Sequence, residues 1–515
     1  MSLFDVTRRH ALALTAIPSV NGTAGEVEAV QYLHDHLRRH PAQRDGRMLL
    51  HLVPCPGDAL GRQVLVAHLR GASQRGVMLL GHVDTVGTYD YGALEPLAFD
   101  PLALTDRVAA GALGQPAAAR ARSGNWLFGR GLLDMKAGVA AALAAFEAFA
   151  AEPAQGHLLF VATPDEEVGS LGVLALGPWL TEYVQSEGIR IEAVINTDYT
   201  AGRPSDAGAR PIYLGSIGKL LAGVYVRGRP SHVGEPEFGL DPSAVVAAVT
   251  SRVVYGKDLV DQDEDEVTPV PVSLYQRDDK PFYDVQTALS ACAYFNVFHM
   301  RRRPAEQFER FLALTREAVE DVRRRYSGFA DPPEVPVYTA QQLWEMAPPA
   351  LKADVSRHAS NRAIDPREQS RRIVADLAES SVGEAPLVAV YFATGLIPAV
   401  RSGEDVRQAV HEAAEERAEA SGERFALHRY FPYISDLSFL GPSPDWQDEA
   451  FPKNHPPTFV APQRAPRLFQ TATVMAGTYG IGAHRPDESI EVGYTFGELP
   501  LLLGTLVRRL WAGSA

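Results

Sequence analysis

The stretch GRGLLDMKAG, residues 129–138, determines how the rest of the chain is interpreted. Its central acid, Asp134, lies in a glycine-rich turn directly before an alanine-rich segment, residues 136–150, that predicts a buried helix. One carboxylate can be shared by two metal ions about 3.5–4 Å apart. We therefore interpret Asp134 as a bridging metal ligand, and we expect the other reactive residues of the chain to lie around it.

Composition limits the classes of protein that this chain can belong to. With 515 residues it is expected to form two or more domains. Its formal net charge of -14 argues against nucleic acid as a partner, because phosphate binding needs a basic surface. No apolar run approaches the roughly 18 residues of a membrane helix, so no membrane partner is expected. The apolar run that Pro18 interrupts is interpreted as part of an amphipathic first helix rather than as a secretion signal.

The chain contains only two cysteines, Cys55 and Cys292, which are far apart in the sequence. This number excludes a disulfide framework and a cysteine zinc cluster, and it favours a reducing, cytoplasmic location. Any metal ion must therefore be held by imidazole and carboxylate groups. Zinc, cobalt and manganese all suit such ligands.

Three buried strands are predicted, and each of them ends in a histidine or a carboxylate. They cover residues 77–84, 157–163 and 193–198. The polar residues at or just after their ends are His82, Asp84, Glu166, Glu167 and Asp198. In open α/β sheets, functional sites form at the carboxyl ends of the strands. The same pattern in three strands is harder to explain by chance than any single motif.

Each of these signals has an ordinary structural explanation when it is taken alone. Paired acids such as Glu166 and Glu167 are common at a solvated helix N-terminus, where the helix dipole favours them. Asp198 could cap a turn, and His484 could be an ordinary loop histidine. Together with His82 and Asp134, however, these residues supply five ligands and a base.

The spacing of the acids suggests different roles for neighbouring side chains. Residues at i and i+2 of an extended strand point the same way, so Asp84 is expected to accept the second imidazole N–H of His82. The side chains of Glu166 and Glu167 should diverge, so that one binds metal while the other faces the attacking water and takes its proton.

The character of the sequence changes near residue 215. From residue 216 to 339 the predicted order is strand, helix, strand, strand, helix and strand, with residues 334–338 as the closing strand, which suggests an inserted α+β domain. The acidic run at residues 261–266 is interpreted as a solvated loop. Residues 88–128 are interpreted as a long connection with few periodic signals. The expected boundaries are 1–215, 216–339 and 340–515, with the first and last parts forming one domain.

These motifs resemble the M20 family of dinuclear zinc peptidases and amidohydrolases. The combination of Gly81-His82-Val83-Asp84, the Asp134 turn and Glu166-Glu167 is specific, and the matching stretches extend from residue 17 to residue 488. The resemblance implies a zinc-peptidase-like three-layer α/β catalytic domain with an inserted α+β, ferredoxin-like lid that often mediates dimerisation. It also implies that His82, Asp134 and Asp198 hold one ion and that Asp134, Glu167 and His484 hold the other.

The resemblance assigns three further roles. Glu166 would be the general base, Asp84 the orienting carboxylate, and His232 the lid histidine that stabilises the oxyanion in its own or a partner subunit. Within the family, segments 218–221, 231–236 and 431–439 look like the arginine-utilisation (RocB-like) branch. The chain departs from the general pattern at Ile434-Ser435 and at residues 296–301, where substrate groups bind in the family.

The expected function is hydrolysis of an amide, peptide, N-acyl or N-carbamoyl bond of a small amino-acid-derived substrate, with a link to arginine catabolism that rests on the resemblance. Two divalent ions, zinc in the first place, are the expected cofactors, and a homodimer through the lid is the expected assembly. Two alternatives remain open from the sequence. The chain could be a catalytically silent binding or regulatory protein with the same fold, or a hydrolase with a single metal ion.

Overall fold

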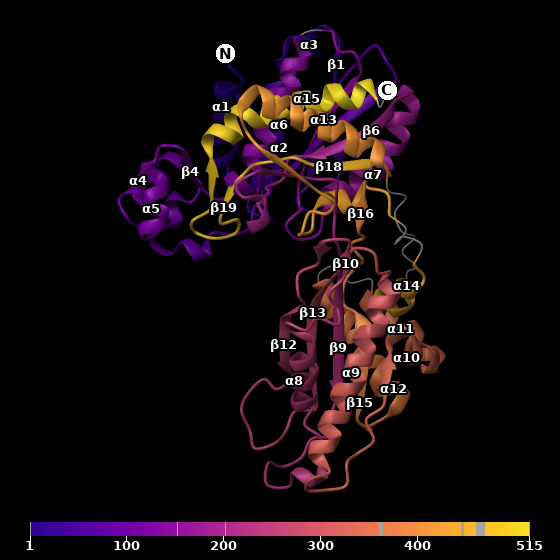
Figure 1. Cartoon of the computed structure of the whole chain (residues 1–515). Coiled ribbons are helices and arrows are strands. Elements are labelled where there is room, and N and C mark those ends of the chain that lie inside the picture. The colour runs from indigo at the N-terminus through magenta and orange to yellow at the C-terminus, as the bar shows by residue number, and fades with distance from the viewer. Residues whose placement is uncertain are drawn as a thin grey trace. The chain divides into compact units, whose positions relative to one another are not determined.

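The computed structural model describes residues 2–151, 153–200, 202–359, 364–443, 448–459 and 469–513. The chain divides into two compact units (Figure 1). The first unit contains Met1–Ser216, Val400–Pro442 and Pro466–Ala515, and the second contains Ile217–Ala399 and Ser443–Ala465. None of the described helices is both long and apolar enough to cross a membrane.

The first unit is built on an eight-stranded mixed sheet with the order β1-β2-β5-β3-β6-β18-β7-β17. In this order the strands are Met48–Pro54, Gln63–Leu69, His157–Thr163, Arg75–His82, Arg190–Asn196, Ala472–Met475, Arg210–Tyr213 and Phe425–His428. The four central strands, β5, β3, β6 and β18, are parallel to one another. Their carboxyl ends therefore lie at one edge of the sheet, as the sequence predicted for three of them.

Helices cover both faces of this sheet and make the unit three-layered. On one face lie α2 (Gly25–Arg38), α6 (Ala137–Ala150), α13 (Glu404–Ser421) and α15 (Leu499–Ala512), and α1 (Leu3–Thr15) packs on α6. The other face is covered by α7 (Leu171–Glu187). A short α3 (Pro41–Arg44) precedes β1. The expected three-layer α/β class is confirmed.

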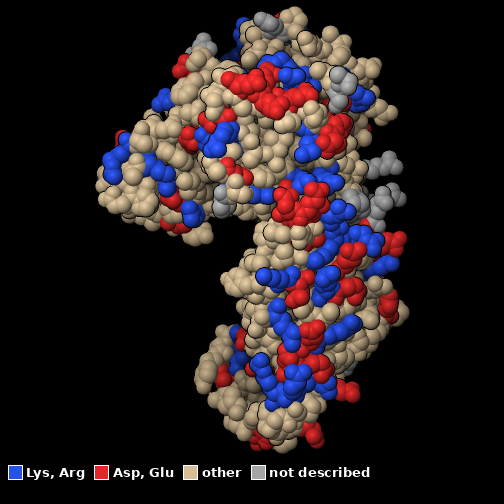
Figure 2. Space-filling model, viewed as in Figure 1, with Lys and Arg blue, Asp and Glu red and all other residues tan. Residues whose placement is uncertain are grey.

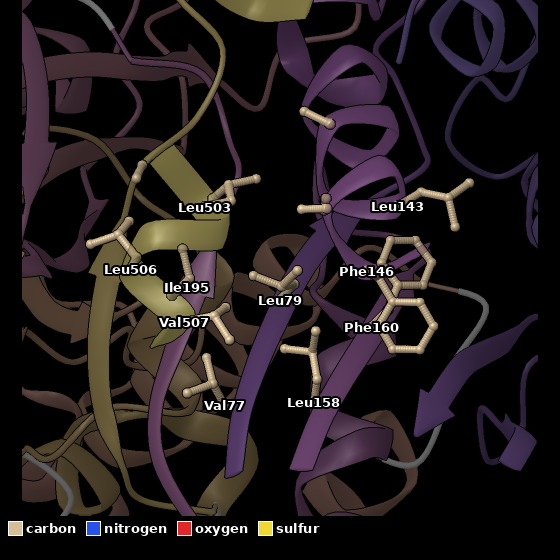
Figure 3. Packing of buried hydrophobic residues seen from close by; sticks show 14 of the residues in the cluster. Val77, Leu79, Leu143, Phe146, Leu158, Phe160, Ile195, Leu503, Leu506 and Val507 are labelled. Atoms are coloured by element: carbon tan, nitrogen blue, oxygen red, sulfur yellow. The ribbon is translucent and has the colours of Figure 1, made fainter. Parts of the chain in front are cut away.

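The core of the first unit lies between the sheet and its helices α6 and α15. Figure 3 shows side chains from β3, β5 and β6 facing side chains from both helices. The labelled residues are Val77, Leu79, Leu143, Phe146, Leu158, Phe160, Ile195, Leu503, Leu506 and Val507, and all of them are buried. Helix α6 is almost entirely buried, as its alanine-rich sequence predicted.

The segment between β3 and β4 (Trp126–Phe128) is more ordered than the sequence suggested. It contains η1 (Tyr89–Leu97), α4 (Pro101–Ala109) and α5 (Gln115–Arg122), which pack beside β4 (Figure 1). These elements share a small apolar cluster of their own. The interpretation of residues 88–128 as a connection with few regular elements was therefore wrong. We call residues 88–125 the helical segment below.

The second unit contains a five-stranded sheet with the order β12-β13-β9-β15-β14. The strands are Val272–Asp278, Ser290–His299, Gly218–Arg227, Leu387–Phe392 and Val337–Thr339. The first four strands in this order, with helices α8 (Pro242–Val253) and α9 (Pro304–Tyr326), give the ferredoxin-like arrangement that was expected. The strand that closes this arrangement beside β9 is β15, however. The strand that was expected to close it corresponds to β14, which pairs with β15 at the edge of the sheet.

The second unit therefore extends past the expected boundary at residue 339. Helices α10 (Ala340–Met346), α11 (Pro349–Ala359) and α12 (Pro366–Val382) pack with β15 over the other face of the sheet. A later helix, α14 (Ala450–Asn454), also packs in this unit against α9 and β15. The physical reason is that β15 completes the sheet, and it brings with it the helices that precede it.

The acidic run at residues 261–266 is not a solvated loop. Asp261 is 2% exposed, and its Oδ2 accepts the backbone N–H groups of Met300, Arg301 and Arg302 at 2.7–2.8 Å. The run forms the short hairpin of β10 (Gln262–Asp263) and β11 (Glu266–Val267). On the visible face of the second unit, acidic and basic side chains are interspersed (Figure 2).

Candidate metal centre

Three chain segments at the carboxyl edge of the main sheet carry the predicted residues. His82 is the last residue of β3 and is 2% exposed. Glu166 and Glu167 follow β5, and Asp198 follows β6 by two residues. Because β5, β3 and β6 are parallel neighbours, their ends bring these side chains to one place.

Asp134 reaches the same place from a turn that only glycines allow. Gly131 has a φ of 71°, in the left-handed region that favours glycine. A Cβ atom on Gly138 would lie 2.0 Å from the carbonyl oxygen of Thr197, so the start of α6 can approach the end of β6 only without a side chain. Asp134 and Asp198 are thereby brought together, and both are buried.

The five predicted ligands form two groups that share Asp134. In one group, the ligand atoms of His82, Asp134 and Asp198 lie within 4.8 Å of one another, and in the other those of Asp134, Glu167 and His484 do so. Oδ1 of Asp134 lies 3.0 Å from His82 Nε2, whereas Oδ2 lies 3.1 Å from His484 Nε2. His484 Nε2 is also 3.0 Å from Glu167 Oε1. The two oxygens of Asp134 thus face different histidines, which is the arrangement that a bridging carboxylate needs.

The carboxylates of this cluster repel one another and are poorly solvated. Burial, followed by the charge of Asp134, raises the pKa values of Asp198 and Glu167. Burial also raises the pKa of Glu166 well above its usual value. The pKa of Asp134 is instead lowered, because its contacts with His484 and His82 outweigh its burial. Among the described residues, the ion pairs of these four acids are all with histidines.

The pKa values of the two histidines of this cluster are raised by the neighbouring carboxylates. Contacts with Asp134 and Glu167 raise the pKa of His484 to about 11. Burial disfavours the charged form of His82, but Asp134 and Asp84 raise the pKa of His82 all the same. Four carboxylates thus face two histidines, and among the described residues no Lys or Arg forms an ion pair with these four acids. Such an excess of acidic groups fits a pair of cations.

Asp84 is buried in the centre, and its carboxylate has partners besides the expected His82. Its Oδ1 and Oδ2 accept the backbone N–H groups of Glu166 and Glu167 at 3.1 and 3.0 Å, and Asn21 donates to Oδ2 at 3.2 Å. His82 Nδ1 lies 3.1 Å from the main-chain oxygen of Asp84 and 3.5 Å from its carboxylate. Asp84 therefore holds the loop with both glutamates, and its carbonyl group is the nearer partner of His82.

His232 belongs to the second unit. It is exposed in the loop after β9, where its Nδ1 accepts the backbone N–H of Gly234 at 3.1 Å. Its assignment to oxyanion stabilisation remains a prediction.

Two buried acids next to the centre received no role from the sequence. Asp436, at the start of η5 (Asp436–Phe439), is 2% exposed, and its Oδ2 accepts the hydroxyl of Thr163 at 3.2 Å. Burial raises the pKa of Asp436 to about 6. Glu488 is fully buried beside the Asp134 turn.

A third group of ligand-type residues lies elsewhere in the first unit. Atoms of His10, His36 and Glu147 also lie within 4.8 Å of one another. These residues lie on α1, α2 and α6, and His10 is buried. No local pattern indicated this group, because its members are scattered over three helices.

Comparisons with known proteins agree with this geometry. A sequence profile of Peptidase family M20/M25/M40 matches residues 78–444. Protein RocB of Bacillus subtilis is 30% identical over 534 residues, covering 95% of this chain and 92% of that protein. The uncharacterised protein YqjN of the same organism is 31% identical, with 97% and 95% covered. Aminopeptidase PepT of Bacillus cereus has a similar fold, with a TM-score of 0.55 and 14% identity over 98% of both chains.

Proposed function

The chain belongs to peptidase family M20/M25/M40, and on that premise we propose that it is a two-metal hydrolase that cleaves an amide-type bond of a small amino-acid-derived substrate. Membership of the family makes it a hydrolase of C–N bonds, of the metallopeptidase type. The observation that carries the finer proposal is the pair of ligand groups that share Asp134.

The residues present fit two divalent ions. His82 and Asp198 would hold one ion, Glu167 and His484 the other, and Asp134 both. Two such ions supply an acidified water and polarise the carbonyl group that is attacked. Zinc is the proposed metal, and cobalt or manganese would suit the same donors.

Glu166 is the proposed general base. Its side chain is not part of either ligand group, yet its Oε2 lies 4.0 Å from His82 Nε2. Its backbone N–H is held by Asp84, so the side chain starts from a fixed point. Glu166 would take a proton from the attacking water and give it to the departing amine. A base whose ionised form is disfavoured by burial and relieved by neighbouring cations is suited to pass a proton in both directions.

The substrate and the assembly are proposed from the resemblance. Segments 218–221, 231–236 and 431–439 favour an arginine-derived N-acyl, N-carbamoyl or dipeptide substrate. His232 would donate a hydrogen bond to the developing oxyanion. We propose a dimer through the second unit, and a cytoplasmic location, with which two buried free cysteines agree.

The test is release of amine by protein that has been stripped of metal and reloaded with zinc, cobalt or manganese. The panel would contain N-acyl, N-carbamoyl and dipeptide derivatives of arginine beside neutral and acidic analogues. We expect hydrolysis only after reloading, with arginine derivatives preferred. Hydrolysis of neutral or acidic analogues in preference to arginine derivatives would overturn the substrate class and leave the reaction type intact.

Glu166→Gln is the matched variant, because glutamine has the same shape and no basic carboxylate. We expect kcat to fall by about 10²–10⁴-fold while two ions still bind. A variant with unchanged kcat would overturn the role of Glu166 as the base. Failure of the wild-type protein to bind any divalent ion would overturn the two-metal proposal itself.

A further inference from the structure

A buried ion pair lies behind Asp134 and belongs to neither ligand group. Arg130 is 1% exposed, Glu488 is fully buried, and Arg130 Nη1 lies 2.7 Å from Glu488 Oε2. The other oxygen, Oε1, accepts the backbone N–H groups of Leu133 and Asp134 at 3.2 and 3.4 Å. One carboxylate thus joins an arginine to the backbone of the shared ligand.

Glu488 also lies in the loop that carries His484. Its own backbone N–H donates to the carbonyl of Arg485, and its carbonyl accepts the N–H of Gly129 at 3.2 Å. The loop that carries His484 is therefore hydrogen-bonded to both ends of the turn that carries Asp134. A substitution of Glu488 should therefore alter the orientation of Asp134 and, through Asp134, the binding of both ions.

The arginine is in turn held by the helical segment, residues 88–125. Nη2 of Arg130 lies 2.9 and 2.8 Å from the two carboxylate oxygens of Asp90, and the guanidinium lies 5.0 Å from the ring centre of Tyr91. A buried guanidinium with two carboxylate partners keeps a fixed position, because moving away from either partner would leave a charge uncompensated.

We propose that Glu488 and Arg130 are positioning residues for Asp134, and that Asp90 makes the helical segment part of the same support. This inference rests on the proposed function, because it assumes that Asp134 binds both ions. The helical segment is then a structural part of the metal centre rather than a surface addition. Partners behind a metal ligand fix its orientation, and their loss typically costs about 10–100-fold in metal affinity.

The test is a metal-binding isotherm of the stripped protein, measured by calorimetry for the wild type, Glu488→Gln and Asp90→Asn. Glutamine keeps an acceptor for the two backbone N–H groups and loses the charge that pairs with Arg130. We expect Glu488→Gln to lower the affinity for both ions by about 10–100-fold and to lower kcat with little change in KM. The side chain of Asp90 is 21% exposed, so we expect Asp90→Asn to weaken the binding of both ions less than Glu488→Gln does.

The matched control is Asp487→Asn. Asp487 is the neighbour of Glu488 and also pairs with an arginine, since its Oδ2 lies 3.0 Å from Arg120 Nη2, but in the described part of the chain its side chain forms no hydrogen bond or ion pair with Asp134. This variant should bind both ions as the wild type does. Circular dichroism would confirm that each variant is folded.

The outcomes separate the inference from the proposed function. If the wild type binds two ions and folded Glu488→Gln binds them with equal affinity, the positioning role is wrong. An effect on one ion only would also contradict it, because Asp134 belongs to both groups. If the wild type binds no ion, the proposed function fails first.

Discussion

Two clusters in the first unit combine histidines with carboxylates at similar spacing, and their surroundings differ. At the candidate metal centre, the carboxylates outnumber the histidines that pair with them, and the pKa values of Asp198, Glu166 and Glu167 are raised. In the helix cluster of His10, His36 and Glu147, each group already has a partner. His36 Nε2 lies 2.6 Å from Glu147 Oε1.

The helix cluster is completed by two further side chains. Tyr32 lies 2.9 Å from His10 Nδ1, and the guanidinium of Arg9 lies 3.2 Å from His10 Nε2. A cation placed there would have to displace an arginine. Donor type and spacing therefore do not distinguish the two clusters. Unbalanced negative charge at the carboxyl edge of the sheet does, and on the proposed function it marks the cluster that binds metal.

The strongest test of this distinction is Asp134→Asn. Because Asp134 belongs to both ligand groups, we expect both ions to be lost and kcat to fall by about 10³-fold or more, since two ions contribute several kcal/mol to the transition state. Metal content after dialysis, measured by mass spectrometry, checks the prediction. Two tightly held ions in this variant would show that charge at Asp134 does not define the site.

His484→Ala should have a smaller and more selective effect. His484 belongs to one group only, and its side chain is 47% exposed. We expect one ion to be lost, the other to stay bound, and kcat to fall by about 10²-fold. Calorimetry would show one binding step instead of two. Loss of both steps would mean that the groups do not bind ions separately.

Lowering the pH should destabilise the folded protein through His10 of the helix cluster. Burial, with the charge of His36, lowers the pKa of His10 from about 6.5 to about 4. The unfolded chain then binds more protons than the folded one between these values. Stability is therefore lost as pH falls from about 6.5 towards 4.

The expected loss between pH 7.5 and 5 is about 2 kcal/mol from this group. Denaturant titration of the wild type and of His10→Gln at both pH values tests it, because the variant lacks the ionisation of His10. An equal change in stability for the two proteins would show that His10 does not control this loss.

His36→Gln should change the least. Glutamine can still donate a hydrogen bond to Glu147, so we expect a loss of about 1 kcal/mol in stability and no change in metal content or kcat. Fewer ions per chain in this variant would break the comparison, because the helix cluster would then be a third metal site.

Local patterns predicted most of the elements but not their partners. The strand at residues 157–163 was predicted with the boundaries that the structure has. Strand β15 falls in residues 340–515, which were assigned to the other unit, because nothing in its buried apolar run says which strand it pairs with. Helices α4 and α5 were missed, since their alanine- and glycine-rich surroundings give no long amphipathic pattern.

The residues of the centre and their division into two groups that share Asp134 were expected, whereas the contacts that support them were not. Parallel strand ends brought together His82, Glu166, Glu167 and Asp198 as expected. The hydrogen bonds from the backbone N–H groups of Glu166 and Glu167 to Asp84 were not predicted, because they come from a loop 82 and 83 positions later in the chain. Glu488 depends on a contact with Arg130, 358 positions earlier, and no local pattern reports such a distance.

The short pair of β8 (Gly215–Ser216) and β16 (Val400–Arg401) has a consequence for how such a chain can change. These strands are the last and first residues of the first unit on either side of the long excursion into the second. A Cβ atom on Gly215 would lie 2.0 Å from the carbonyl oxygen of Val400, so the two ends are in close contact. Residues 217–399 of the second unit therefore leave the first unit and return to it at neighbouring positions. Residues can therefore be added to or removed from the inserted part while the first unit, which carries His82, Asp134, Glu167, Asp198 and His484, keeps its own framework.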